Sequence, residues 1–153
     1  MDEDQYRATY HKINQQRCVY EKAINNRRCD CRYKKPFLLA TREGIGCLSE
    51  EYLGHCSEFL NTLRDGSRFA LREICIDGPL PHNKELKVQA GGCIALQKIL
   101  SSEPDNTPDT APDIYELMHN SLSRYGSIDA LPYSELVKGV LNYESRRKRR
   151  GGK

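Results

Sequence analysis

The chain has 153 residues, with 24 basic and 21 acidic side chains and a formal net charge of +3. Six of the basic residues lie in the final segment RRKRRGGK (146–153), so the rest of the chain is mildly acidic, which argues against a domain-wide nucleic-acid-binding surface. No apolar run is long enough to span a membrane, and MDEDQYRATYHK (1–12) lacks the features of a secretory signal, so we expect a cytoplasmic, reducing setting.

The first predicted element is a helix over residues 3–25. Its buried face is indicated by residues that recur every three or four positions: Tyr6, Tyr10, Ile13, Arg17, Tyr20 and Ile24. Residues 29–47 are predicted to be irregular, because Pro36 disfavours helical backbone before it and glycines interrupt the remainder. A second helix is expected to begin after Ser49, a good N-cap, and to end near Asp65-Gly66.

The middle of the chain is predicted to be less helical. ELKVQA (85–90) alternates apolar and polar residues, which is typical of a strand, and RFALREICI (68–76) is ambiguous between helix and strand. The turn-forming residues DGPLPHN lie between them. We therefore expect a minor β-hairpin formed by residues 69–76 and 85–90, with a short helix, CIALQKIL, after Gly91-Gly92.

The last third of the chain reads as a linker followed by two helices. SSEPDNTPDTAPD (101–113) contains three prolines and four acids and too few apolar residues to build a core. Asp113 is expected to cap the helix that follows it, and another helix begins near Pro132. The predicted fold class is mainly α with a minor β-hairpin. It comprises a helical core domain with a cysteine-bearing irregular segment (1–100), a flexible linker (101–113) and a C-terminal helix pair with a basic tail (114–150).

Seven cysteines, an odd number, argue against a disulfide framework in a reducing compartment. Four of them fall within 30 residues and are the predicted metal ligands: Cys18, Cys29, Cys31 and Cys47. Four thiolates suit a tetrahedral zinc ion or an iron–sulfur cluster, although the Cys-x-x-Cys turn common at zinc sites is absent. Cys56, Cys75 and Cys93 are expected to be core thiols. His55 or Cys56 remains an alternative ligand, and a metal-free protein remains an alternative altogether.

Basic residues surround the Cys29–Cys31 pair and make up the tail. The candidate anion-binding residues are Arg27, Arg28, Arg32, Lys34, Lys35, Arg146, Arg147, Lys148, Arg149 and Arg150. Those near the cysteines would offset the negative charge of a metal–thiolate centre, or would bind phosphate or an acidic partner. The tail is equally consistent with a solvated helix end whose cations complement the helix dipole.

Three functions follow from these patterns. The leading hypothesis is a small cytoplasmic metalloprotein with a structural, sensory or electron-transfer role. The first alternative is a regulator that binds nucleic acid or another polyanion through its basic tail. The second is a metal-free interaction module whose C-terminal helix pair docks on a protein partner. The chain has no P-loop, dinucleotide-binding fingerprint or nucleophile elbow, so the motifs do not predict an enzyme.

Overall fold

The computed structural model describes residues 2–73 and 78–144. The elements in chain order are α1 (Glu3–Ile13), α2 (Glu21–Asn25), β1 (Lys34–Leu39), β2 (Arg42–Cys47), α3 (Glu50–Ser67), α4 (His82–Leu100), the 3-10 turn η1 (Pro104–Asn106), α5 (Ile114–Tyr125), η2 (Ile128–Ala130) and α6 (Tyr133–Asn142). This confirms a mainly α fold with one minor antiparallel hairpin. Within the described ranges, no helix is long and apolar enough to cross a membrane.

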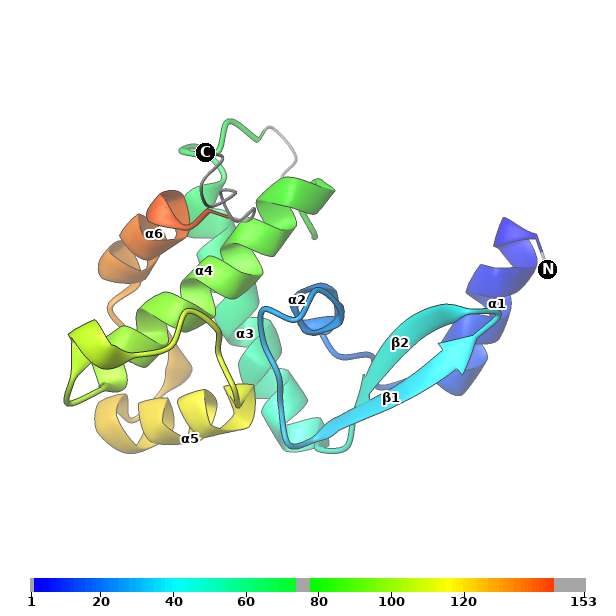
Figure 1. The fold of residues 1–153 in the computed structure, drawn as a ribbon, viewed down its shortest axis with the longest axis horizontal. Helices are drawn as coiled ribbons and strands as arrows, with labels where there is room; N and C mark the ends of the chain where they lie inside the picture. The colour runs from blue at the N-terminus through cyan, green and yellow to red at the C-terminus, as the bar shows by residue number, and fades with distance from the viewer. Residues whose placement is uncertain (1, 74–77, 145–153) are drawn as a thin grey trace, which may run out of the picture.

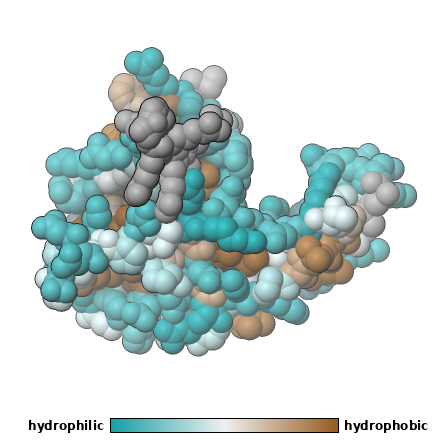
Figure 2. All heavy atoms as spheres, in the orientation of Figure 1, coloured by the Kyte–Doolittle hydropathy of each residue, from teal (hydrophilic) through white to brown (hydrophobic). Residues whose placement is uncertain are grey.

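The molecule consists of a helical body and an arm. Helices α3 to α6 pack together as the body, and the hairpin and α1 project from it (Figure 1). The surface between body and arm is concave, and hydrophobic residues are visible on the arm among hydrophilic ones (Figure 2). Leu38, on strand β1, is an exposed large hydrophobic residue. The arm therefore carries apolar surface away from the main core.

The predicted strand at residues 85–90 is wrong, because these residues lie within α4. Glu85 and Gln89 are polar but buried, and they lie one helical turn apart. The alternation of polar and apolar residues therefore does not mark one exposed and one buried face of a strand. Gly92 lies within α4 and does not end it. The absence of a side chain there allows close packing against α3, because a Cβ would collide with the Leu63 side chain. Of the other predicted strand, residues 69–73 form turns or coil and 74–76 lie outside the described residues.

The hairpin lies instead at residues 34–47, where the sequence predicted irregular structure. Its register runs from Lys34 paired with Cys47 to Leu39 paired with Arg42. The two turn residues, Ala40 and Thr41, have φ angles of +56° and +89°. Two-residue hairpin turns of this left-handed type usually contain Asn-Gly, so Ala-Thr gave no hairpin signal. The expectation of an irregular 29–47 segment is therefore wrong for its larger part.

The predicted helix over residues 3–25 is interrupted. Helix α1 ends at Ile13, and the segment 14–20 then runs along β2 before α2 begins. Buried Asn14 donates its side-chain amide to the Tyr10 hydroxyl (2.8 Å) and to the Ile45 carbonyl (3.1 Å). Arg17 forms a β-bridge with Gly46. Pairing with the hairpin thus overrides the helical periodicity of this stretch.

Three helices follow the sequence closely. The Ser49 hydroxyl accepts the Tyr52 N–H (3.2 Å) at the start of α3, which runs through Gly66 and ends at Ser67. Helix α5 spans the predicted residues, and α6 follows Pro132. Asp113 occupies the N-cap position of α5, but its carboxylate binds Arg32 instead of capping the helix.

The C-terminal helix pair and the first hundred residues share one hydrophobic core. Phe59 and Leu96 belong to the same buried cluster as Met118 and Leu136. The predicted linker leads into this core, because Ala111 is fully buried and its carbonyl accepts the Asp30 N–H (2.8 Å). Flexibility of the whole 101–113 segment stays a prediction; its end is bonded to the body.

A buried ion pair joins α3 to α4. Arg64 binds the Glu85 carboxylate at 2.7 Å, and the Leu80 N–H (2.9 Å) and the Gln89 amide (2.7 Å) also donate to it. Burial alone would raise the pKa of Glu85, but these hydrogen bonds hold it below its usual value. Gln89 in turn accepts the Ala23 N–H (3.0 Å), which attaches α2 to the body.

We expect Glu85→Gln to destabilise the fold by about 3–5 kcal/mol at neutral pH, because it leaves buried Arg64 without its counter-charge. Because the pKa of Glu85 is lowered in the folded state, the carboxylate stabilises the fold fully above about pH 4.5, its ordinary pKa. This contribution is lost as the pH falls through the lowered pKa. Urea unfolding of both proteins should therefore show a gap in free energy that narrows in acid. Glu135→Gln, in an exposed pair with Lys138, is the matched control and should cost less than about 1 kcal/mol. A gap that does not change with pH would contradict this origin.

Candidate metal centre

Four thiols line one small enclosed cavity where the arm meets the body. They are Cys18, Cys31, Cys47 and Cys56. The other lining residues are apolar or aromatic: Tyr20, Tyr33, Tyr52, Leu53, Ile114 and Tyr115. The cavity volume of about 20 Å³ is enough for one water-sized group. All four cysteines are free thiols.

The thiols come from four separate parts of the chain. These are the segment before α2, the loop after α2, the end of β2 and the second turn of α3. Backbone pairing places the first and third side by side: the Cys18 N–H donates to the Ile45 carbonyl (3.0 Å), and the Cys47 N–H donates to the Gln16 carbonyl (2.8 Å). The cavity therefore forms only when arm and body have assembled.

Backbone groups influence the ionisation of two of the cysteines. The backbone of Tyr20 acts to lower the pKa of Cys18, and the backbone of Tyr33 and of Tyr115 acts to lower the pKa of Cys31. Tyr115 lies in the first turn of α5, where N–H groups have no partner within the helix. Hydrogen bonds to sulfur and a helix N-terminus both favour the thiolate over the thiol. The backbone is thus arranged to stabilise negative charge on these sulfurs.

Burial opposes that effect while no cation is bound. It raises the pKa of Cys18 to about 12, raises that of Cys31 and raises that of Cys56 well above its usual value. Among the described residues, no three His, Cys, Asp or Glu side chains are gathered as ligands around one point. A metal ion would have to replace the thiol protons and draw the sulfurs inward, since only thiolates are strong ligands.

Three of the four predicted ligands line this cavity, and Cys29 does not. Cys29 is buried close to Cys93, and burial together with the neighbouring Cys29 thiol raises the pKa of Cys93 well above its usual value. Residues two apart in a strand share a face, but this stretch turns after its bridge to Ala111, so Cys29 and Cys31 diverge. Cys56 takes the fourth position. Its place on the apolar stripe of α3 made it look like an ordinary core thiol.

The remaining residues of interest lie elsewhere. His55 does not line the cavity; its ring packs against Tyr52 with 5.3 Å between ring centroids. Cys93 is fully buried, as expected of a core thiol. Cys75 and the basic tail, with Arg146, Arg147, Lys148, Arg149 and Arg150, lie outside the described residues.

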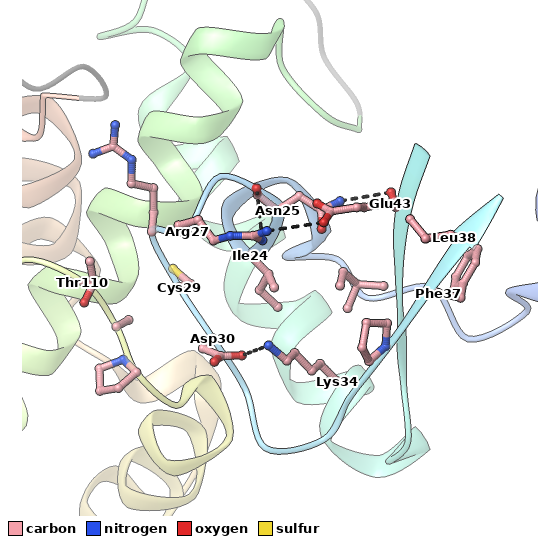
Figure 3. A pocket seen from close by; sticks show the side chains of 15 residues that line it. Ile24, Asn25, Arg27, Cys29, Asp30, Lys34, Phe37, Leu38, Glu43 and Thr110 are labelled. Atoms are coloured by element: carbon pink, nitrogen blue, oxygen red, sulfur yellow. Dashed lines mark hydrogen bonds and ion pairs between the residues drawn. The ribbon is translucent and has the colours of Figure 1, made fainter. Parts of the chain in front are cut away.

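Cys29 also lines a larger, open cavity of about 740 Å³ between the hairpin and the segments on either side of it (Figure 3). Three of the predicted anion-binding residues, Arg27, Arg28 and Lys34, line this cavity. Two of them form ion pairs with acidic residues that also line it. Arg27 binds Glu43 (3.3 Å), and Lys34 binds Asp30 (2.7 Å). Their charges are therefore already balanced within the chain.

The other basic residues near the cysteines differ from one another. Arg28 donates to the Tyr143 hydroxyl (3.1 Å). Arg32 binds Asp113 (2.6 Å) and lies over the Tyr115 ring, 4.6 Å from its centroid. Lys35 forms no ion pair within the described residues. This segment thus uses most of its cations to hold the chain together, and binding of nucleic acid through it stays a prediction.

Partly buried aromatic rings separate the cavity from solvent. Tyr115 packs edge-on against Tyr33 (4.9 Å between centroids) and against Tyr52 (4.6 Å). His119 stacks on Tyr115 (5.7 Å), and its Nδ1 lies 3.2 Å from the Tyr52 hydroxyl. The Arg32 guanidinium also lies over the Tyr115 ring and adds to this cover. The site is therefore shielded by side chains of α5, of α3 and of the segment before β1.

Comparison with known proteins identified no relatives. No protein-family model matches the chain, and no curated protein or solved structure matches it either. The chemistry of the four-cysteine cavity is consequently the basis for assigning a function.

Proposed function

We propose that the protein is a small metalloprotein whose centre is held by Cys18, Cys31, Cys47 and Cys56. The observation that carries this proposal is the convergence of four free thiols, from four separate parts of the chain, on one enclosed cavity. Four small hydrophobic side chains would fill such a space equally well and, unlike thiols, would not be prone to oxidation. A set of four thiolates is the ligand set of structural zinc sites and of iron–sulfur clusters.

Two observations bear on which metal is bound. No two ligands lie within four residues of each other, which differs from the close pairs of most zinc sites and equally from the close cysteine spacings of most iron–sulfur sites. The cavity volume of about 20 Å³ suits a single ion, and a cluster would require the surrounding segments to move apart. Spacing thus selects neither metal, and the cavity volume favours zinc. The visible spectrum of the protein distinguishes a zinc ion from a cluster.

The chain itself has two tasks in this proposal. The backbone of Tyr20, Tyr33 and Tyr115 stabilises the charge of the Cys18 and Cys31 thiolates. The aromatic cover excludes water and so sets the dielectric environment of the centre. The bound metal supplies the cross-link between arm and body and, if it is a cluster, a redox couple.

We expect protein purified without oxygen or chelator to contain one metal centre per chain, detected by elemental analysis and visible absorbance. Serine substitution of Cys18, Cys31, Cys47 or Cys56 should abolish metal retention, because serine is a poor ligand for zinc and for clusters. Cys29→Ser and Cys93→Ser are the matched controls and should retain the metal. Loss in Cys29→Ser with retention in Cys56→Ser would contradict this ligand set, and wild-type protein without zinc or iron would contradict the centre itself.

Tyrosine fluorescence offers a second test. The chain has nine Tyr and no Trp, and four Tyr line the cavity. Cobalt(II) bound by thiolates absorbs in the near ultraviolet and should quench this emission, with an end point at one ion per chain. Cys56→Ser should abolish the quenching, and Cys93→Ser should preserve it. Equal quenching of both variants would indicate that cobalt binds elsewhere.

The metal-free protein should lose stability in alkali. The pKa of Cys18 is raised from 9.0 to about 12 by burial, so folding favours its protonated form. That contribution is fully present below about pH 9 and is lost as pH rises towards 12, because the unfolded thiol ionises first. Denaturant unfolding at increasing pH should therefore show a steeper loss for wild type than for Cys18→Ala. Parallel pH profiles for the two proteins would refute the assignment to this thiol.

A further inference from the structure

An open groove adjoins the four-cysteine cavity, and Cys47 lines both. The groove has a volume of about 330 Å³ and lies between the end of α1 and the ends of the paired strands. Lys12 and Ile13 come from α1, Lys35 from β1 and Leu48 from the residue after β2. All these residues belong to the arm, which projects from the body (Figure 1).

The groove carries positive charge that the chain does not balance. Lys12 and Lys35 are exposed, and neither forms an ion pair within the described residues. No Asp or Glu lines the groove. Arg27, Lys34 and Arg32, by contrast, are each bound to an acid of the same chain. The two lysines are thus available to carboxylates of another molecule.

The same groove exposes apolar side chains. Ile13 is 51% exposed and Leu48 is 62% exposed, and both are among the most exposed large hydrophobic residues of the described chain. Isolated exposed apolar residues are ordinary, but two that line one groove offer area whose burial favours association. No Tyr, Phe or His ring lines the groove, so it has no platform on which nucleic-acid bases could stack.

We propose that this groove binds an acidic segment of a partner protein, with carboxylates at Lys12 and Lys35 and an apolar side chain against Ile13 and Leu48. A groove of this size indicates a small, transient interface. The partner would contact Cys47, so it would reach the metal centre directly. That last consequence rests on the proposed function, whereas the docking itself does not.

The test uses the full chain and a fluorescein-labelled synthetic peptide of alternating glutamate and leucine, with binding followed by fluorescence anisotropy at low salt. Lys12→Glu combined with Lys35→Glu should weaken binding by about tenfold or more, because two repulsive contacts replace two attractive ones. The matched control is Lys98→Glu combined with Lys138→Glu, which makes the same change in net charge at exposed positions outside the groove. It should change the affinity by less than about twofold.

Two further arms separate the alternatives. Leu48→Ser should weaken peptide binding several-fold and leave the binding of labelled oligothymidylate unchanged. Equal losses in the two double variants would assign binding to general charge and overturn the proposal. Oligothymidylate that binds more tightly than the peptide, and loses its affinity in the Lys12/Lys35 variant, would assign the groove to nucleic acid and also overturn it.

The docking and the metal centre can fail independently. The peptide is therefore titrated into protein with its metal and into protein stripped with a chelator. Groove-dependent binding to the stripped protein supports docking whatever the fate of the metal centre. Metal retention without groove-dependent binding leaves the proposed function intact and overturns the docking.

Discussion

The assembly of the site depends on one buried carboxylate, that of Glu21. It accepts hydrogen bonds from the Ile45 N–H (2.6 Å), from the Tyr10 hydroxyl and from Arg17, whose guanidinium lies 2.8 Å away. A buried carboxylate is costly unless such partners surround it, so its burial selects one arrangement of α1, β2 and α2. That arrangement aligns residues 16–18 with β2 and so brings Cys18 beside Cys47. The four-cysteine cavity inherits its geometry from this polar contact.

The other half of the site depends on the chain returning after α4. Ala111 bonds to the backbone on both sides of Cys29, accepting the Asp30 N–H (2.8 Å) and donating to the Arg28 carbonyl (3.0 Å). The Ile114 N–H then donates to the Asp30 carbonyl (2.9 Å), which fixes the first turn of α5 against the cysteine loop. The Asp113 carboxylate binds Arg32 and does not cap α5. A segment with the composition of a linker thus performs a positioning task.

The sequence predicted those elements whose formation depends on residues close to one another along the chain. The Ser49 cap and the apolar stripe of α3 suffice to form that helix, and α5 and α6 are similarly evident. The hairpin was missed because Ala40 and Thr41 adopt left-handed backbone that only the surrounding contacts justify. The predicted helix CIALQKIL forms the second half of α4. Its first half was missed because Glu85 and Gln89 are buried together, and their partner Arg64 is distant in sequence.

The candidate site shows the same division. Clustering in the sequence identified Cys18, Cys31 and Cys47, which need only be near one another along the chain. It could not separate Cys29 from Cys31, since that choice depends on how the segment turns after its contact with Ala111. It could not select Cys56 either, because a cysteine on an apolar helix face resembles an ordinary core residue. The clustering of cysteines in the sequence therefore indicated the region of the cavity, and tertiary contacts determine which cysteines line it.

The order of the site's components along the chain has a consequence for synthesis. All four thiols precede residue 57, whereas Ile114 and Tyr115, which complete the cavity wall, come much later. Domains acquire structure from the N-terminus as the ribosome extends the chain. A nascent chain therefore presents its thiols without their aromatic cover until α5 emerges. For the metalloprotein proposed above, loading during translation would meet an open site and loading after release a closed one, so the proposal makes the timing of metal supply part of maturation.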